Sequence, residues 1–235
     1  MILDLLATNN WKRPVYFATT VGDDSYLGLQ DYFQLEGLAY RLVPVKNPPS
    51  EKNRGEIGRI EPNLMYQNIM NKFKWGGVEK KSIYMDENNL RMTMNLRSSF
   101  SRLASELISR EEKAKAIKVL DKLMQVLPEN NVPYDYLMIG VADNYYKAGN
   151  TQQGDKILLR YADIIEKENN YYASQKRNIA SQFKNDIERN MYIFSNIMQV
   201  ASIAKRESII TKLKPRFERL QSNMPESSFN QSSED

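Results

Sequence analysis

The sequence contains neither cysteine nor histidine. The absence of cysteine excludes disulfide bonds, thiolate metal ligands and a cysteine nucleophile. The absence of histidine removes the usual general base near neutral pH, the commonest zinc ligand and the Ser-His-Asp triad. Catalysis by this chain would depend on carboxylates, and none is convincingly paired. We therefore predict no catalytic residue, no metal site and no cofactor, and we do not expect the chain to be an enzyme by itself.

Long apolar runs are also missing, because no stretch reaches about 18 apolar residues. The sequence therefore predicts no membrane-spanning helix. The opening segment Met1–Ala7 is too short for a signal peptide and lacks a basic start. We expect the chain to be either cytosolic or a piece of a larger protein.

The composition is that of a folded domain. The 235 residues suffice for one compact domain or two small ones, and 41% of them are hydrophobic. Most of the net charge of +4 falls in residues 171–235. That segment could meet an anionic membrane or an acidic partner, although a solvated helix face is the commoner meaning of such an excess. The Walker and GxGxxG motifs are absent, so nucleotide binding by those routes has no support. A dense Lys/Arg stripe is also absent, so we expect no nucleic-acid binding.

Two stretches between residues 98 and 168 share one helical pattern, each with two helices around a short polar turn. The first has apolar or small residues at Phe100, Leu103, Ala104, Leu107, Ala116, Leu120 and Leu123. The same offsets in the second give Met138, Val141, Ala142, Tyr145, Gly154, Leu158 and Tyr161. This spacing is typical of tetratricopeptide repeats.

The repeat is imperfect. Ala116 and Gly154 are 38 positions apart, whereas the tetratricopeptide period is about 34. Pro128 closes the first copy, and Glu166 stands in its place in the second. A generic helical bundle with coincidental spacing is the alternative, and we favour tetratricopeptide-like pairing.

The N-terminal part has a different pattern. Residues 15–19 are rich in β-branched and aromatic residues and predict a strand. Residues 38–44 alternate between apolar and other residues and predict a second strand, with a helix at 26–34 between the two. A strand, a helix and a strand within so few residues indicate a small parallel βαβ unit. Residues 82–85 predict a third strand.

These patterns predict a mainly α protein with a small N-terminal α/β subdomain. The predicted parts are an α/β subdomain with a connecting loop and helix at 1–88, two tetratricopeptide-like hairpins at 89–168, C-terminal capping helices at 169–221, and a disordered tail at 222–235. Within the caps we expect one long helix over 172–204 and another over 206–221 that Pro215 kinks or splits.

Three groups of residues are candidates for binding. Trp11, Lys12 and Arg13 could form an aromatic–cation patch for a sugar or a lipid headgroup. We favour the alternative, in which this segment anchors the entrance of the strand and Trp11 packs on the core. Asp23 and Asp24 could hold a cation or sugar hydroxyls, but Gly-Asp-Asp-Ser is ordinary turn and cap chemistry, which we favour.

The third group consists of tyrosines around the second hairpin. Tyr134, Tyr136 and Tyr146 are candidates for a recognition surface, because exposed tyrosines recur where proteins bind one another. Some tyrosines of this region must instead belong to the core, Tyr145 above all.

One long run and two shorter runs carry a family resemblance. The run ATNNWKRPVYFATTVGDDSYLGLQDYFQLEGLAYRLVPV, residues 83–103 and the run PYDYLMIGVADNYYKAG resemble the C-terminal region of the family called domain of unknown function 2723. WKRPVYFA and GLAYRLVP carry most of the specificity. The members are large bacterial membrane proteins, notably of the Bacteroidetes, related to protein O-mannosyltransferase-like glycosyltransferases.

The resemblance implies a soluble part that follows a multi-span membrane domain and faces the extracytoplasmic, periplasmic side. Enzymes of this class use a lipid-linked sugar donor, and their catalytic carboxylate lies in an early loop outside this chain. We therefore expect a non-catalytic accessory domain that binds an acceptor protein or another partner, next to the membrane domain of the same polypeptide. The alternative is a free-standing cytoplasmic adaptor that binds a peptide in the concave face of its repeats.

Overall fold

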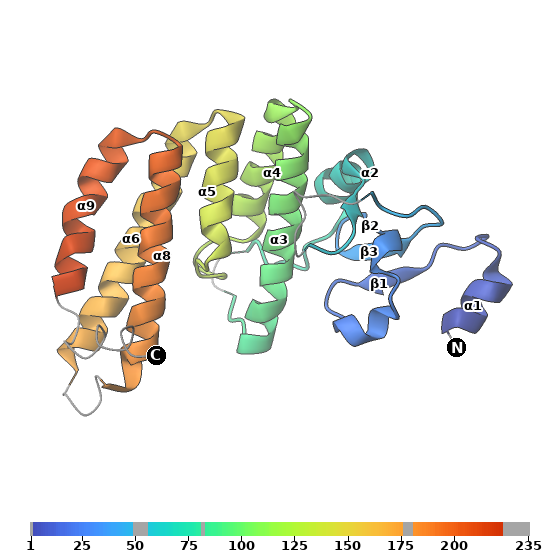
Figure 1. Cartoon of the computed structure of the whole chain (residues 1–235), viewed down its shortest axis with the longest axis horizontal. Helices are drawn as coiled ribbons and strands as arrows, with labels where there is room; N and C mark the ends of the chain where they lie inside the picture. Colours follow the sequence, from blue (N-terminus) through green and yellow to red (C-terminus); the bar gives the residue numbers. More distant parts are fainter. Residues whose placement is uncertain (1, 49–55, 81–82, 176–180, 223–235) are drawn as a thin grey trace, which may run out of the picture. The chain divides into compact units, whose positions relative to one another are not determined.

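The computed structural model describes residues 2–48, 56–80, 83–175 and 181–222 (Figure 1). Helices make up most of these residues, and all the described strands come before residue 61. The chain forms two compact units, an N-terminal unit, Met1–Pro133, and a C-terminal unit, Tyr134–Asp235. The prediction of a mainly α protein with a small N-terminal sheet is confirmed.

The sheet of the N-terminal unit has the order β1-β3-β2-β4. Its strands are β1 (Tyr16–Ala18), β2 (Phe33–Leu35), β3 (Ala39–Leu42) and β4 (Arg59–Ile60), and they follow the helix α1 (Ile2–Asn9). The strand β3 is antiparallel to both β1 and β2, and β4 is parallel to β2.

The predicted βαβ unit is wrong. The strands β1 and β3 are direct antiparallel neighbours, and such a pair needs no helical crossover. Between them the chain forms two 3-10 turns, η1 (Asp23–Tyr26) and η2 (Gln30–Tyr32). Leu27 and Gly28 both have positive φ angles, 54° and 74°, which interrupt the predicted helix after one turn.

The predicted third strand at 82–85 is also not found. Ser82 lies outside the described residues, and residues 83–85 are not in a strand. The short strand β4 occupies the remaining edge beside β2 instead.

One face of the sheet is an aromatic core. Alternate residues of a strand point to opposite faces, and Phe17, Phe33 and Tyr40 share the apolar face. The rings of Phe33 and Tyr40 stack with centroids 5.4 Å apart. Tyr26 from η1 packs edge-on against Phe33 at 5.1 Å. Such pairs add roughly 0.5–1.5 kcal/mol each beyond the area that they bury.

A short helix leads away from the sheet. Pro62 begins α2 (Pro62–Gln67), and the last turn, η4 (Asn68–Lys72), is π-helical. Its wider hydrogen bond runs from the Phe73 N–H to the Asn68 carbonyl, 2.9 Å away. Single π-helical turns are uncommon and recur at functional sites.

The first hairpin completes the N-terminal unit, and consists of α3 (Glu87–Ser109) and α4 (Lys113–Val126). The Asp86 carboxylate caps α3 by accepting from the Asn89 N–H at 2.8 Å. Arg102 of α3 donates to the Gly58 carbonyl at 2.8 Å and pairs with Glu56 at 2.9 Å. This arginine therefore ties the segment before β4 to the hairpin.

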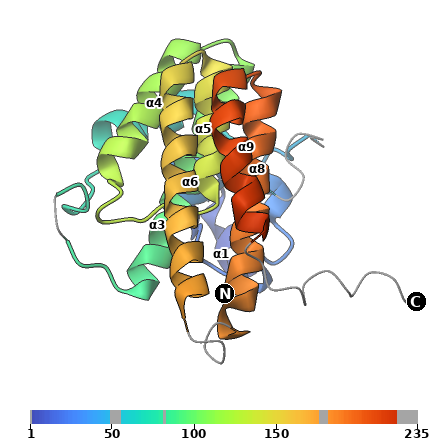
Figure 2. The ribbon, with the colours of Figure 1, turned by 90° about the vertical axis from the view of Figure 1, so that its left-hand side faces the viewer.

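The C-terminal unit is helical throughout its described residues (Figures 1 and 2). Its elements are α5 (Leu137–Ala148), α6 (Thr151–Ser174), the 3-10 turn η5 (Ser181–Phe183), α8 (Lys184–Ile203) and α9 (Glu207–Ser222). The helix α6 contacts α5, α8 and α9. Gly149, with a φ of 95°, ends α5 in the left-handed conformation, which costs a glycine little.

The helix–turn–helix pattern is confirmed in both copies. All the matched positions of the two copies are buried, namely Phe100, Leu103, Ala104, Leu107, Ala116, Leu120 and Leu123 in the first and Met138, Val141, Ala142, Tyr145, Gly154, Leu158 and Tyr161 in the second. The helix α4 ends just before Pro128, as the missing N–H of proline requires. The helix α6 meets no proline and continues to Ser174.

The expectation of one helix over 172–204 is wrong. Residues 172–174 belong to the end of α6, and α8 begins only at Lys184; residues 176–180 lie outside the described part. The helix α9 is continuous through Pro215, so the predicted split does not occur. The predicted disordered tail lies outside the described residues, except for Ser222 at the end of α9.

Candidate functional site

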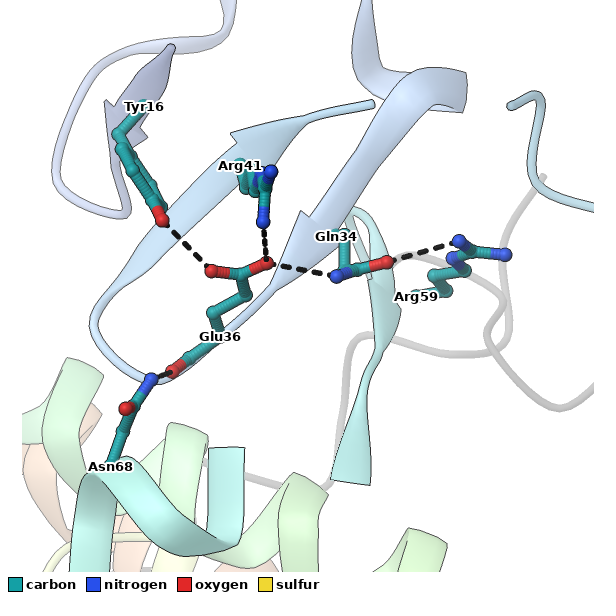
Figure 3. Close-up of polar contacts among 6 residues, drawn as sticks. All are labelled: Tyr16, Gln34, Glu36, Arg41, Arg59 and Asn68. Atoms are coloured by element: carbon teal, nitrogen blue, oxygen red, sulfur yellow. Dashed lines mark hydrogen bonds and ion pairs between the residues drawn. The ribbon is translucent and has the colours of Figure 1, made fainter. Parts of the chain in front are cut away.

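The second face of the sheet is polar. The strand register aligns Tyr16, Arg41, Gln34 and Arg59 in one row across the four strands. Glu36 follows Gln34 by two residues, so it points to the same face. Its side chain lies beside this row, as Figure 3 shows. We call these five side chains the Glu36 network.

The Glu36 carboxylate is the centre of the network, with only 6% of the residue exposed. The Tyr16 hydroxyl donates to Oε2 at 2.9 Å, and the Gln34 amide donates to Oε1 at 2.9 Å. Arg41 Nη1 also donates to Oε1, at 3.4 Å. A buried charge is tolerated only when it is paired and hydrogen-bonded, and these partners satisfy that requirement.

A second set of contacts holds these partners in place. Arg59 Nη2 donates to the Gln34 side-chain oxygen at 3.0 Å, which orients the amide toward Glu36. Asn68 from the π-helical turn donates to the Glu36 backbone carbonyl at 2.7 Å (Figure 3). Burial and the hydrogen bond to Glu36 raise the pKa of Tyr16, so its hydroxyl remains a donor at neutral pH.

A pocket of about 300 Å³ opens beside Glu36. It is lined by Tyr16, Glu36, Leu38, Ala39, Asn68, Lys72 and Phe73. We call it the Glu36 pocket. Gly37 makes the close approach of Phe73 possible, because a Cβ at Gly37 would lie 2.5 Å from Phe73 Cζ.

Glu36 was not among the residues predicted to bind a ligand. The alternation in Phe33-Gln34-Leu35-Glu36 and in Tyr40-Arg41-Leu42 is the signal that could have found it. This alternation places Gln34, Glu36 and Arg41 on one face of a short sheet. The first of the two strands was not recognised, because a helix was predicted over residues 26–34.

The C-terminal unit holds a larger groove, of about 790 Å³, between α5, α6 and α8. Its aromatic and charged walls include Tyr134, Tyr136, Tyr161, Glu168, Arg189 and Tyr192. We call it the tyrosine groove. Tyr136 and Tyr192 are 59% and 70% exposed, and the Tyr134 and Tyr161 rings meet edge-on with centroids 6.0 Å apart.

Amides form much of the polar lining of the tyrosine groove. Asn190 is buried and donates to Glu168 Oε2 and to Asn169 Oδ1, both at 3.0 Å. Asn196 and Gln199, which follow Asn190 along α8, also line the groove. Each amide offers both a donor and an acceptor, which matches the groups of a peptide backbone.

The structure brings together Tyr134 and Tyr136 of the three predicted tyrosines, and places Tyr146 elsewhere. The Tyr146 hydroxyl donates to Asp155 Oδ1 at 2.9 Å. Arg206 donates to the two oxygens of the same carboxylate at 3.0 and 2.6 Å. Burial, with the hydrogen bond to Asp155, raises the pKa of Tyr146. Asp155 of α6 therefore joins Tyr146 of α5 to Arg206, the residue before α9.

The Trp11, Lys12 and Arg13 segment lies after α1 and is exposed. Trp11 is 52% exposed, so the interpretation that it packs on the core is wrong. Asn9 instead holds the turn, because its side chain donates to the Arg13 carbonyl at 2.7 Å.

Asp23 and Asp24 lie exposed in η1, so their predicted place in a turn is confirmed. At this turn neither carboxylate forms a capping hydrogen bond. Within the described residues, no group of three or more acidic side chains could hold a metal ion.

None of the described helices is long and apolar enough to cross a bilayer. Residues 1–64 match the family model described as TMEM260-associated domain 2, which is a different model from domain of unknown function 2723. The matched segment contains the whole sheet and every residue of the Glu36 network. No curated protein and no solved structure matches the chain.

Proposed function

We propose that this chain is a non-catalytic accessory module of a membrane glycosyltransferase-like protein, and that it binds an acceptor or partner protein. The observation that carries the proposal is the tyrosine groove. Its volume of about 790 Å³ lies in the upper part of the range of ligand pockets, roughly 300–1,000 Å³. A groove of this size accommodates several residues of an extended peptide.

The chemistry of the groove supports a peptide ligand. Exposed tyrosines supply rigid contact area and a hydroxyl, and they are frequent among the residues that dominate binding energy. The amides of Asn196 and Gln199 can pair with main-chain groups. The carboxylates of Asp135 and Glu168 would repel a nucleic-acid backbone, whose binding depends on phosphate neutralisation.

In this proposal the two helical hairpins are tetratricopeptide-like, and the second of them carries part of the groove. The burial of every matched position supports this assignment, and so do Ala104 and Ala142, both fully buried small residues. Small residues at these positions let paired helices approach closely. The continuation of α6 to Ser174 departs from the pattern, and it follows from the missing proline.

The membrane context rests on the resemblance to domain of unknown function 2723. The match of residues 1–64 to a family described as an associated domain supports an accessory role. In this context the module would face the extracytoplasmic, periplasmic side of the inner membrane beside the membrane domain of its own polypeptide.

The alternative is a free-standing peptide-binding adaptor in the cytoplasm, which the groove supports equally. The genomic reading frame upstream of Met1 separates the two. An open frame that encodes a series of apolar spans supports the membrane module. A stop codon with a ribosome-binding site just upstream supports the adaptor.

The binding function itself is tested by affinity selection from a library of random peptides displayed on phage. Selected peptides are then titrated into the chain by fluorescence anisotropy. Substitution of Tyr136 or Tyr192 by alanine should weaken binding about tenfold or more, which corresponds to about 1.4 kcal/mol. Tyr171→Ala is the matched control, because Tyr171 is as exposed as Tyr136, at 59%, and lies outside the groove.

Equal affinity of the Tyr136→Ala, Tyr192→Ala and Tyr171→Ala variants would show that the peptide binds elsewhere. Failure to select any peptide that binds more tightly than about 1 mM would contradict the peptide-binding function altogether.

A further inference from the structure

The Glu36 network contains more than a satisfied ion pair. The carboxylate has about four acceptor positions, and Tyr16, Gln34 and Arg41 occupy three of them. Oε1 accepts two of these bonds and Oε2 accepts one. Oε2 therefore retains an acceptor position, and Glu36 lines the pocket directly. We propose that the Glu36 pocket binds a neutral, polyhydroxylated six-membered ring.

The π-helical turn supports a binding role. Asn68 and Lys72 are the first and last residues of η4, and both line the pocket with Phe73. Because π-helical turns recur at functional sites, this turn supports a binding role in addition to the buried carboxylate.

The charges around the pocket favour a neutral ligand. Arg41 already opposes the charge of Glu36 at 3.4 Å, and Lys72 adds an exposed ammonium group. A cation would be repelled by both basic groups, and an anion would face the buried carboxylate. A hydroxyl group suits both ends, because it donates to Glu36 Oε2 and accepts from Lys72.

The size and walls of the pocket favour a single ring. The volume of about 300 Å³ is at the lower end of the range for ligand pockets. Tyr16 and Phe73 supply aromatic surface, and Leu38 and Ala39 supply aliphatic surface. Such walls suit the C–H face of a hydroxylated ring, while its edge reaches Glu36, Asn68 and Lys72.

Two sources share this chemistry, a pyranose sugar and a cyclitol. The test therefore titrates the intact chain with methyl hexopyranosides and with myo-inositol, and follows backbone amides by two-dimensional NMR. Acyclic sorbitol serves as the control for hydroxyl content. We expect saturable shifts confined to the residues that line the pocket, with a dissociation constant on the order of 1 mM.

The pattern of shifts identifies the source. A response to the glycosides alone supports a pyranose, and a response to myo-inositol alone supports a cyclitol. An equal response to sorbitol overturns the ring assignment. The absence of saturable shifts at roughly 100 times the expected dissociation constant overturns the proposal.

Variants locate the site. Lys72→Met should weaken binding at least about fivefold, whereas Lys74→Met, at an exposed lysine that does not line the pocket, should leave it unchanged. Glu36→Gln keeps the size of the side chain and should abolish binding. Because that variant changes a buried group and could unfold the sheet, Lys72→Met and Phe73→Leu keep the test independent of Glu36. Equal binding by Lys72→Met and Lys74→Met would contradict the assignment.

This inference does not depend on the tyrosine groove. Peptide binding is read from Tyr136 and Tyr192, and ring binding is read from Lys72. Either result can fail without affecting the other.

Discussion

The Glu36 network and the arginines near α9 use arginine–carboxylate contacts in different ways. In the N-terminal unit the Glu36 carboxylate is buried, and side chains of one sheet face surround it beside an open pocket. In the C-terminal unit the pairs lie at partly exposed positions and join α9 to α6, through Arg206 with Asp155 and Arg216 with Asp163 and Glu166. The first arrangement surrounds a buried carboxylate beside a pocket, and the second holds two helices together.

This difference can be tested by substitutions whose effect on the stability of each unit is measured. The fluorescence of the two tryptophans reports on one unit only. Both Trp11 and Trp75 belong to the N-terminal unit. Tryptophan fluorescence therefore follows the unfolding of that unit in urea. Far-UV circular dichroism follows the helices of both units. A change in the circular dichroism transition without a change in tryptophan fluorescence therefore belongs to the C-terminal unit.

The largest effect is expected at Glu36. Glu36→Ala leaves Tyr16, Gln34 and Arg41 without their shared acceptor. Removal of one partner from a buried pair typically costs 3–5 kcal/mol. Because Arg41 is partly exposed, we expect about 2–3 kcal/mol less stability by tryptophan fluorescence. Asp31→Ala breaks the exposed pair with Lys46 and should cost less than about 0.5 kcal/mol. Equal losses would contradict the buried role of Glu36.

The next effect concerns the close contact of Gly37 with Phe73. Gly37→Ala places a Cβ 2.5 Å from Phe73 Cζ, at a φ of 145°. Overpacking and backbone strain should together cost roughly 1–3 kcal/mol in the urea unfolding of the N-terminal unit. Gly22→Ala is the control, because a Cβ there meets nothing within 4 Å. If the two alanine variants were equally stable, Phe73 would not be fixed against Gly37.

A smaller effect is expected at the α6–α9 contact. Arg216 is largely covered and donates to Asp163 and Glu166, both at 2.7 Å. Arg216→Ala should lower the stability of the C-terminal unit by about 1–2 kcal/mol in the circular dichroism transition. Arg219, which is 67% exposed and reaches Glu166 at 3.4 Å, is the matched control and should change it by less than about 0.5 kcal/mol. The fluorescence transition should not change in either variant.

The smallest effect is a dependence on pH. Burial alone would raise the pKa of Asp155, but the hydrogen bonds from Arg206 and Tyr146 outweigh it and hold that pKa below its usual value. A carboxyl group with a lowered pKa stabilises the fold above its unfolded pKa, and that contribution is lost as the pH falls through the folded pKa.

Unfolding midpoints of the wild-type chain and of Asp155→Asn should therefore converge as the pH is lowered from about 6 to 3, with the wild type losing more. Parallel curves for the two proteins would mean that Asp155 does not contribute through its charge.

The sequence predicted the helices far better than the sheet. The hairpins were predictable because apolar residues such as Leu103, Leu107 and Leu120 recur at helical spacing over long segments. The sheet was not predictable in this way, because its strands contain only two to four residues. Such short runs contain too few residues to distinguish a strand from a helix, and residues 26–34 were assigned wrongly for this reason.

The two candidate sites also differ in how well the sequence predicted them. Tyr134 and Tyr136 were recognisable from composition, because they cluster in the sequence before α5. The Glu36 network was not, because its members come from four strands, and only the register of the sheet aligns Tyr16 with Arg41 and Arg59. The boundary between α6 and α8 was predicted too early, before residue 172, whereas α6 continues to Ser174 and α8 begins at Lys184.

The most direct test of the account asks where a bound peptide lies. Tyr192 and, in a separate variant, Tyr171 are replaced by a photo-crosslinking benzoyl-phenylalanine, and a selected peptide is added before irradiation. We expect a crosslinked product from position 192, which lines the tyrosine groove, and none from position 171, which does not. Equal crosslinking at both positions, or crosslinking at position 171 alone, would contradict it.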